Sequence, residues 1–146
     1  MSEDLTLRVF IDANILLDLY DETRIFHQDS LKSISALASR YDVVLYTSCD
    51  IITTLYYILA KVNKTRALET IMDVSELCEI VEFSNKEVIH SCQLMTDKNS
   101  SYKDLEDTIQ AVLAQKAQCV LILSNDKNFI SQDIELLTSK QYASKV

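Results

Sequence analysis

The 146-residue sequence contains no glycine and no proline. This absence excludes the P-loop and the GxGxxG dinucleotide-binding motif, because both need backbone conformations that only glycine permits. Turns that require left-handed backbone must then use other residues, and asparagine and aspartate tolerate that conformation best. We therefore expect left-handed backbone in turns and at helix ends at four asparagines: Asn63, Asn85, Asn99 and Asn125.

The sequence also lacks a long hydrophobic run and a basic charge balance. No apolar stretch approaches membrane-spanning length, and the polar, acidic residues 1–8 do not form a secretory signal. Aspartate and glutamate total 22 against 14 lysines and arginines, which gives a net charge of −8. An acidic protein repels nucleic acid at long range, so a simple nucleic-acid-binding module is disfavoured. The negative charge does not disfavour an enzyme that binds divalent cations, because the bound ions reverse the local charge.

The four cysteines are not spaced as a CxxC pair, so we interpret them as reduced, partly buried thiols of a cytoplasmic protein. A chain of this length buries enough surface to fold without a disulfide or a structural metal. We expect residues 1–146 to form a single domain.

Apolar strands alternate with helical patterns along the chain. The predicted strands are residues 7–11, 42–46, 79–83, 119–123 and 135–137. The predicted helices are residues 14–20, 25–40, 48–62, 65–77 (capped by Thr65), 84–95, 103–116 and a short one near Asn128. Because the strands are apolar on both faces, the pattern predicts an α/β fold, a three-layer α/β/α sandwich with a central, mostly parallel sheet. The active site of such folds lies outside the carboxyl ends of the strands.

Acidic residues lie just beyond the ends of two of these strands. Asp12 follows the first strand, and Asp126 closes the Ser124-Asn125-Asp126 segment after the strand at 119–123. Asp104 and Asp107 lie three residues apart, so they share one face near the start of a helix. Taken alone, that helical pair could be ordinary dipole-stabilising acids, and Asp126 an ordinary turn residue.

Together, these acids predict a cation site. Three or four carboxylates in one pocket cannot all stay ionised without cations between them. Oxygen ligands favour Mg²⁺ or Mn²⁺. Two such ions about 4 Å apart would activate a water and stabilise the leaving oxygen during in-line cleavage of a phosphodiester.

With these residues in view, the sequence resembles the PIN-domain nucleases over nearly its whole length. The similarity rests on the order and spacing of four segments: FIDANILLDLYDETR, TSCDIITTLYYILAK, DLEDTIQAVLA and LILSNDKNF. The third segment is similar to D-x-E-D-A-[IL]-Q, the pattern of one subgroup. The resemblance implies a PIN-like fold and a set of metal and catalytic acids: Asp12, Asp107 and Asp126 as metal ligands, with Asp104 beside them. It also implies supporting roles for Asn14, which follows the first acid, and for Ser124, which takes the place of a usual threonine.

Three positions depart from the family pattern. Thr54 stands where the second motif usually carries an acid, and Asp50, one turn earlier, either compensates or is a plain helix-start charge. Asn125 replaces a common arginine, and Asn128 replaces a common aspartate. These changes favour weakened metal binding or lost activity.

The resemblance implies a cytoplasmic Mg²⁺- or Mn²⁺-dependent endoribonuclease, the toxin of a toxin–antitoxin pair, which dimerises and is blocked by a protein antitoxin. A basic patch, Lys61, Lys64 and Arg66, either contacts the RNA backbone or is a solvated helix end. The alternative function is a catalytically weak or inactive PIN-like scaffold that binds a protein partner. A receiver-like phosphoacceptor domain is disfavoured, because Ser124 stands where that family needs a lysine.

Overall fold

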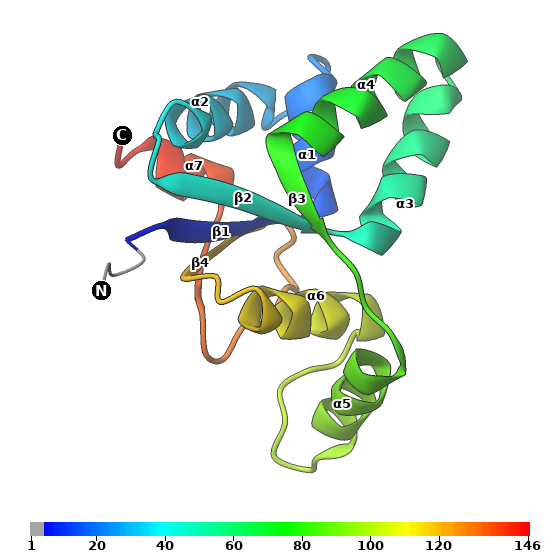
Figure 1. Cartoon of the computed structure of the whole chain (residues 1–146), viewed down its shortest axis with the longest axis vertical. Helices are drawn as coiled ribbons and strands as arrows, with labels where there is room; N and C mark the ends of the chain where they lie inside the picture. Colours follow the sequence, from blue (N-terminus) through cyan, green and yellow to red (C-terminus); the bar gives the residue numbers. More distant parts are fainter. Residues whose placement is uncertain (1–4) are drawn as a thin grey trace.

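The computed structural model describes residues 5–146 and contains a central sheet covered by helices on both faces (Figure 1). All strand pairings are parallel, and the strand order is β3-β2-β1-β4-β5. The strands are β1 (Leu7–Ile11), β2 (Val43–Ser48), β3 (Cys78–Val81), β4 (Leu121–Leu123) and β5 (Glu135–Leu137). The predicted α/β sandwich is confirmed. Residues 1–4, at the start of the segment predicted not to be a secretory signal, lie outside the described residues.

The helices form two layers around this sheet (Figure 1). One layer holds α1 (Ala13–Tyr20), α2 (His27–Ala38), α3 (Cys49–Ala60), α4 (Lys64–Leu77) and α7 (Ser139–Ala143). The other holds α5 (Asn85–Thr96) and α6 (Leu105–Lys116). Alternate side chains of β1 serve both layers: Val9 and Ile11 join the core under α1 and α2, and Phe10 joins the core under α6. Burial on both faces explains why the strands read as continuous apolar runs.

The strand order places a crevice beside the end of β1. From β1 the chain builds β2 and β3 on one side of the sheet, then returns to add β4 and β5 on the other. In open α/β sheets, ligands bind at such a reversal, outside the carboxyl ends of the strands. The backbone N–H of Asp12 donates to the carbonyl of Leu123 at 3.0 Å, so the segments that follow β1 and β4 start side by side.

The end of α6 shows how this glycine-free chain makes a left-handed turn. Among residues 5–146, Gln118 alone has a positive φ, 59°, so the expectation that asparagines would take this role is wrong. Two hydrogen bonds hold the turn: Gln118 N–H donates to Gln115 O at 2.9 Å, and Cys119 N–H donates to Ala114 O at 2.8 Å. This pair is the Schellman motif, which normally carries glycine at the left-handed position.

Two other local predictions are wrong. The segment near Asn128 is a turn and not a helix. The Asp126 side chain accepts from Asn128 N–H at 2.9 Å, which stabilises the turn. Asn63, not Thr65, caps α4, since its side chain accepts from the N–H of Arg66. The helix α7 was not predicted. None of the helices in residues 5–146 is both long and apolar enough to cross a bilayer.

The four cysteines are free thiols, and the prediction that all of them are partly buried is wrong for Cys92, which is exposed. Burial raises the pKa of Cys78 and of Cys119 to about 12, so both thiols stay protonated at neutral pH. A protonated, buried thiol is a poor nucleophile and a poor metal ligand. Neither Cys78 nor Cys119 is therefore a candidate nucleophile or metal ligand.

Candidate functional site

Asp12 is held in place as the residue that begins α1. Its Oδ1 accepts from the N–H of Ala13 at 2.7 Å, which satisfies a free donor at the helix start. Its Oδ2 accepts from Ser124 Oγ at 2.7 Å and from Asn14 Nδ2 at 2.9 Å. Only 4% of Asp12 is exposed, and every donor that fixes it is neutral. A buried carboxylate with no cationic partner is costly, so the geometry leaves a place for a positive ligand.

The segment after β4 is attached to the same carboxylate. Ser124 Oγ, which donates to Asp12, also accepts from the N–H of Asp126 at 3.1 Å. Asn14 Oδ1 accepts from the N–H of Asn125 at 2.9 Å. Asn14 and Ser124 thus fix the loop that carries Asp126 against the end of β1. Both residues contact Asp12, as the predicted supporting role requires. The role itself stays a prediction.

The remaining acids stand at the start of α6. Asp104 is its N-cap residue, and its Oδ1 accepts from the N–H of Asp107 at 2.9 Å. Asp107 is half-buried, whereas Asp104 and Glu106 are exposed. With three acids at its start, α6 has carboxylates where the helix dipole is positive.

One open pocket of about 260 Å³ joins these groups. It is lined by the four predicted acids together with five other residues: Ala13, Asn14, Leu17, Glu106 and Gln110. The structure therefore brings Asp12, Asp104, Asp107 and Asp126 to one place, from the ends of two strands and the start of one helix. Their roles as catalytic groups and metal ligands stay predictions.

Burial, together with the neighbouring negative charges, raises the pKa of two of these aspartates. Burial raises the pKa of Asp107 to about 7, and the negative charges of Asp104, Asp12, Asp126 and Glu106 add to the shift. Burial also raises the pKa of Asp12, although the hydrogen bonds from Ser124 and Ala13 oppose it. Each shift has the sign expected when carboxylates crowd without a compensating cation.

The second-motif residues lie outside this pocket. Asp50 is half-buried at the start of α3, where its Oδ1 accepts from Ser48 Oγ. Its charge reaches Glu106, whose pKa is raised by burial first and then by Asp50 and Asp12. Thr54 is exposed on α3 and lines a separate hollow with Thr53, Tyr57 and Ile58. An acid that matches the second motif is thus absent from the pocket lining, and Asp50 acts on it only at a distance.

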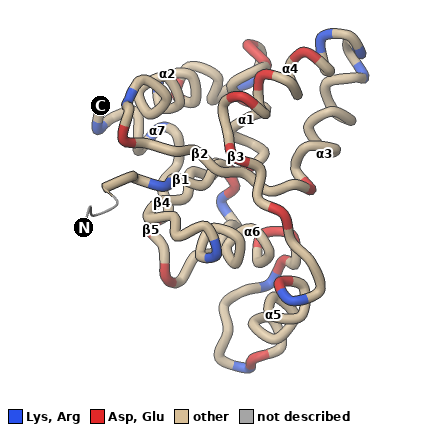
Figure 2. Tube along the Cα trace, in the orientation of Figure 1, with Lys and Arg blue, Asp and Glu red and all other residues tan. Residues whose placement is uncertain are grey.

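The predicted basic patch also lies elsewhere. Lys61 ends α3, and Lys64 and Arg66 begin α4, so the patch forms the tip of the α3–α4 hairpin. Figure 2 shows this tip in blue at the end of the hairpin farthest from the sheet. Neither pocket that contains Asp107 is lined by any of the three.

Two pocket residues were missed from the sequence. Glu106 and Gln110 belong to the DLEDTIQ segment and lie one helical turn apart on α6. The signal that could have found them is their spacing: positions i, i+3 and i+4 share a helix face, so Gln110 lies on the face of both Glu106 and Asp107. Their presence makes the pocket lining richer in oxygen than the aspartates alone.

The donor set fits a divalent cation, although it is not pre-assembled. Carboxylate and amide oxygens are the ligands that Mg²⁺ and Mn²⁺ prefer, and the pocket offers no histidine or thiol. Within residues 5–146, no group of three or more acidic, histidine or cysteine side chains is already placed to hold an ion. The acids would therefore have to turn toward a bound ion, as an exposed side chain such as that of Glu106 can do.

Comparison with known proteins identifies the family. The PIN domain family model matches residues 9–135. Ribonuclease VapC1 of Aquifex aeolicus (strain VF5) is 47% identical over 140 residues, which cover 94% of each chain. This chain belongs to the PIN domain family.

Solved structures share the fold of this PIN domain at low sequence identity. The VapBC2 complex of Rickettsia felis, bound to a DNA fragment from its promoter, matches with a TM-score of 0.67 and 16% identity, over 90% of this chain and 98% of that one. VapC20 of Mycobacterium tuberculosis, described as a sarcin–ricin loop cleaving toxin, matches with a TM-score of 0.67 and 10% identity, over 83% of this chain and 92% of that one.

The departure at Asn125 has a structural explanation in this PIN domain. Its Nδ2 donates to Asp18 Oδ2 at 2.6 Å, and its Oδ1 accepts from Ser139 N–H at 2.9 Å. Asp18, only 2% exposed, also receives Arg24 Nε at 2.7 Å. The asparagine therefore connects α1 to the start of α7 and fixes the loop that carries Asp126.

The metal-free PIN domain should lose stability as the pH rises. The pKa of Asp107 is higher in the folded chain, about 7, than its ordinary value of 3.8. Between these values the folded state binds more protons than the unfolded state, so the free energy of unfolding falls as pH increases and levels off above about pH 7. We expect Asp107→Asn to stabilise the metal-free protein at pH 8 by about 1–2 kcal/mol, a figure reduced for solvent screening.

Urea unfolding in the presence of a chelator, at pH 5 and at pH 8, measures this effect. The gain from Asp107→Asn should shrink at pH 5, where the wild-type carboxyl is protonated. Asp133→Asn, a neutralisation outside the pocket, is the control. A variant that is less stable than the wild type at pH 8 would contradict the crowding of charges at this helix start.

Proposed function

We propose that this PIN domain is a Mg²⁺- or Mn²⁺-dependent endoribonuclease, with Asp12, Asp107 and Asp126 as ion ligands and Asp104 beside them. The observation that carries the proposal is Asp12: a carboxylate 4% exposed, bonded only to neutral donors, that lines the same pocket as three other aspartates. The relative named as a ribonuclease, 47% identical, supports the activity. One domain, formed by the whole chain, would carry it.

Bound divalent ions would polarise the phosphate and lower the pKa of a water, so that hydroxide is available to attack the phosphorus. The chain's own residues prepare the site for this chemistry. Ser124 and Asn14 hold one oxygen of Asp12 and the N–H of Ala13 holds the other, so the carboxylate keeps one orientation at the wall of the pocket. Asp107 and Asp126 come from separate elements, α6 and the loop after β4, so they close the pocket from two sides.

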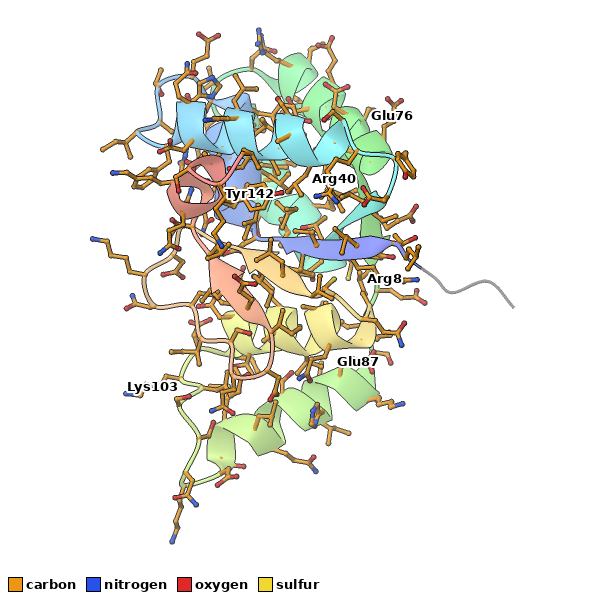
Figure 3. The ribbon with its side chains drawn as sticks, turned by 90° about the vertical axis from the view of Figure 1, so that its left-hand side faces the viewer. Arg8, Arg40, Glu76, Glu87, Lys103 and Tyr142 are labelled. Atoms are coloured by element: carbon orange, nitrogen blue, oxygen red, sulfur yellow. The ribbon has the colours of Figure 1, made fainter. Side chains whose placement is uncertain are left out.

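A second, larger pocket supports RNA as the substrate. It measures about 530 Å³ and shares Asp104 and Asp107 with the acid pocket. Its lining includes two exposed lysines, Lys103 and Lys127. Lys103 lies on the loop that leads into α6 (Figure 3). An RNA strand that presents one phosphate to the acids would place neighbouring phosphates within this lysine-lined pocket, where charge attraction favours them.

Replacement of both lysines by alanine should weaken RNA binding. In an Asp12→Asn background that prevents cleavage, we expect Lys103→Ala/Lys127→Ala to bind single-stranded RNA about tenfold less tightly at 0.1 M salt. The slope of log affinity against log salt should fall by about 0.7 per lost phosphate contact. Fluorescence anisotropy at several salt concentrations measures both quantities.

The matched control removes two lysines at the hairpin tip, as Lys61→Ala/Lys64→Ala. It should bind RNA as the parent does. If the tip variant loses affinity and the pocket variant does not, the RNA follows the α3–α4 hairpin instead.

We further propose that the protein acts in the cytoplasm as the toxin of a toxin–antitoxin pair, forms a homodimer and is blocked by an antitoxin. The similarity to VapBC complexes supports this assignment. A catalytically inactive scaffold is the second candidate, favoured by the absence of a second-motif acid from the pocket and by exposed apolar residues on α3, among them Tyr57 at 71%.

The test of the proposed function is RNA cleavage by the full chain with and without added Mn²⁺ or Mg²⁺. We expect cleavage with either ion and none after chelation. Cleavage that survives complete removal of divalent ions would contradict the mechanism. No cleavage with any ion, together with tight binding of a protein partner, would favour the scaffold.

A further inference from the structure

Gln110 is a buried polar residue with an unsatisfied hydrogen-bond acceptor. It is 1% exposed, yet its side-chain oxygen Oε1 has no hydrogen-bond partner. Among residues 5–146, no other buried side-chain nitrogen or oxygen is in this state. Buried polar groups in native proteins are nearly always paired, so an orphaned acceptor calls for a ligand that carries a donor.

The place of Gln110 shows where such a ligand would sit. Gln110 lines the acid pocket with Asp12, Asp107 and Asp126. It lies three residues after Asp107 on α6, so both side chains belong to one face of that helix. The flanking positions of that helix, Ile109 and Ala111, are buried apolar residues. Gln110 thus lies in a buried segment of α6, where a polar side chain needs a partner inside the protein or in the pocket.

The missing partner must be a hydrogen-bond donor that tolerates surrounding carboxylates. A water bound to a divalent cation meets both conditions, because the ion polarises its O–H groups and neutralises the acids. Mg²⁺ keeps several waters when proteins bind it, so donors of this kind would be present. An anionic ligand would offer the oxygen of Gln110 no proton and would be repelled by the acids.

We propose that Gln110 is a positioning residue of the ion site. Its amide oxygen accepts a hydrogen bond from a water in the coordination shell of the cation held by Asp12 and Asp107. This inference rests on the proposed function. It adds that α6 contributes a neutral acceptor, Gln110, as well as a charged ligand, Asp107. The neutral acceptor would fix the orientation of a water close to the phosphate.

The proposal predicts opposite effects on ion binding and on stability. Gln110→Met removes the acceptor and keeps a similar volume. We expect the affinity for Mn²⁺ to fall about tenfold, the lower end of the effect of residues that orient metal-site groups. The metal-free variant should melt at or above the wild-type temperature, by up to about 2–4 °C, because the unpaired oxygen is gone.

The experiment is calorimetric titration of Mn²⁺ into the full chain, with thermal unfolding in chelator. Gln115→Met is the matched control: Gln115 lies on the same helix, but it is exposed and donates to Asp133 at 2.8 Å. It should bind Mn²⁺ as the wild type does. A third variant, Gln110→Glu, keeps an oxygen acceptor and adds charge, so it should bind Mn²⁺ at least as tightly as wild type.

The outcomes separate this inference from the function beneath it. Equal Mn²⁺ affinity in wild type and Gln110→Met overturns the role of Gln110 and leaves the proposed nuclease intact. Absence of Mn²⁺ binding by the wild type overturns both. If Gln110→Met loses ion affinity and stability together, Gln110→Glu decides: restored Mn²⁺ binding supports the proposal, and lost binding assigns Gln110 to packing alone.

Discussion

Replacement of Asp12 by asparagine is expected to lower the rate of RNA cleavage by at least about a thousand-fold. The loss corresponds to several kcal/mol of transition-state stabilisation, the contribution of a metal ion to phosphodiester cleavage. Asparagine keeps the shape of the side chain, and its oxygen can still accept from the N–H of Ala13. The folded structure should therefore survive while the ion is lost. Initial rates at saturating Mn²⁺ measure the effect.

A matched variant separates loss of the site from loss of charge. Asp73→Asn neutralises an exposed aspartate on α4, outside both pockets that contain Asp107, and should cleave RNA at the wild-type rate. The free energy of unfolding of Asp12→Asn in chelator should stay close to that of the wild type, because removal of a buried negative charge offsets the loss of the hydrogen bond that Asn14 Nδ2 donates to Oδ2. Equal cleavage by Asp12→Asn and wild type would place the chemistry elsewhere.

The second large effect concerns the buried carboxylate of Asp18. Its side chain is 3% exposed and pairs with Arg24, whose side chain is 37% exposed. We expect Arg24→Met to lower the free energy of unfolding by about 3 kcal/mol, since loss of the cation leaves a desolvated charge with one neutral donor, Asn125. Urea unfolding at pH 7 measures the change.

The protein supplies a control for this effect in a second arginine–aspartate ion pair, which is not buried. Arg40 donates to Asp42 at 2.8 and 3.0 Å, but neither partner is buried, and Arg40 lies at the surface beyond the end of α2 (Figure 3). Arg40→Met should change the free energy of unfolding little, because exposed ion pairs contribute little. Similar losses from the two variants would show that burial of Asp18 is not what makes its partner important.

The sequence predicted the convergence of acids because strand ends in a parallel sheet share one edge. Asp12 follows its apolar run directly, Asp126 follows another after two polar residues, and Asp104 and Asp107 have helical spacing, so local pattern and sheet topology were enough. Whether Asp50 replaces the second-motif acid could not be predicted, because helix spacing does not fix the distance between α3 and the acids at the sheet edge. The structure leaves it outside the pocket lining.

The features that the sequence did not predict depend on long-range contacts. Gln110 reads as an ordinary helical residue, and its burial arises only when α6 packs on the sheet. The helix α7 is five residues long, and its buried Ser139 is held by Asn125. Gln118 adopts the left-handed conformation because it follows the last residues of α6, and the place where the helix ends, not residue preference, determines which residue makes the turn.

The carboxylates of Asp12 and Asp107 are expected to share a divalent cation, and a crystal of the full chain grown with Mn²⁺ would reveal that ion. The anomalous signal of manganese locates the ion independently of the protein atoms. We predict a peak in the acid pocket, about 2.1–2.2 Å from a carboxylate oxygen of each residue. Manganese at full occupancy elsewhere, with the acid pocket empty at millimolar Mn²⁺, would contradict the account.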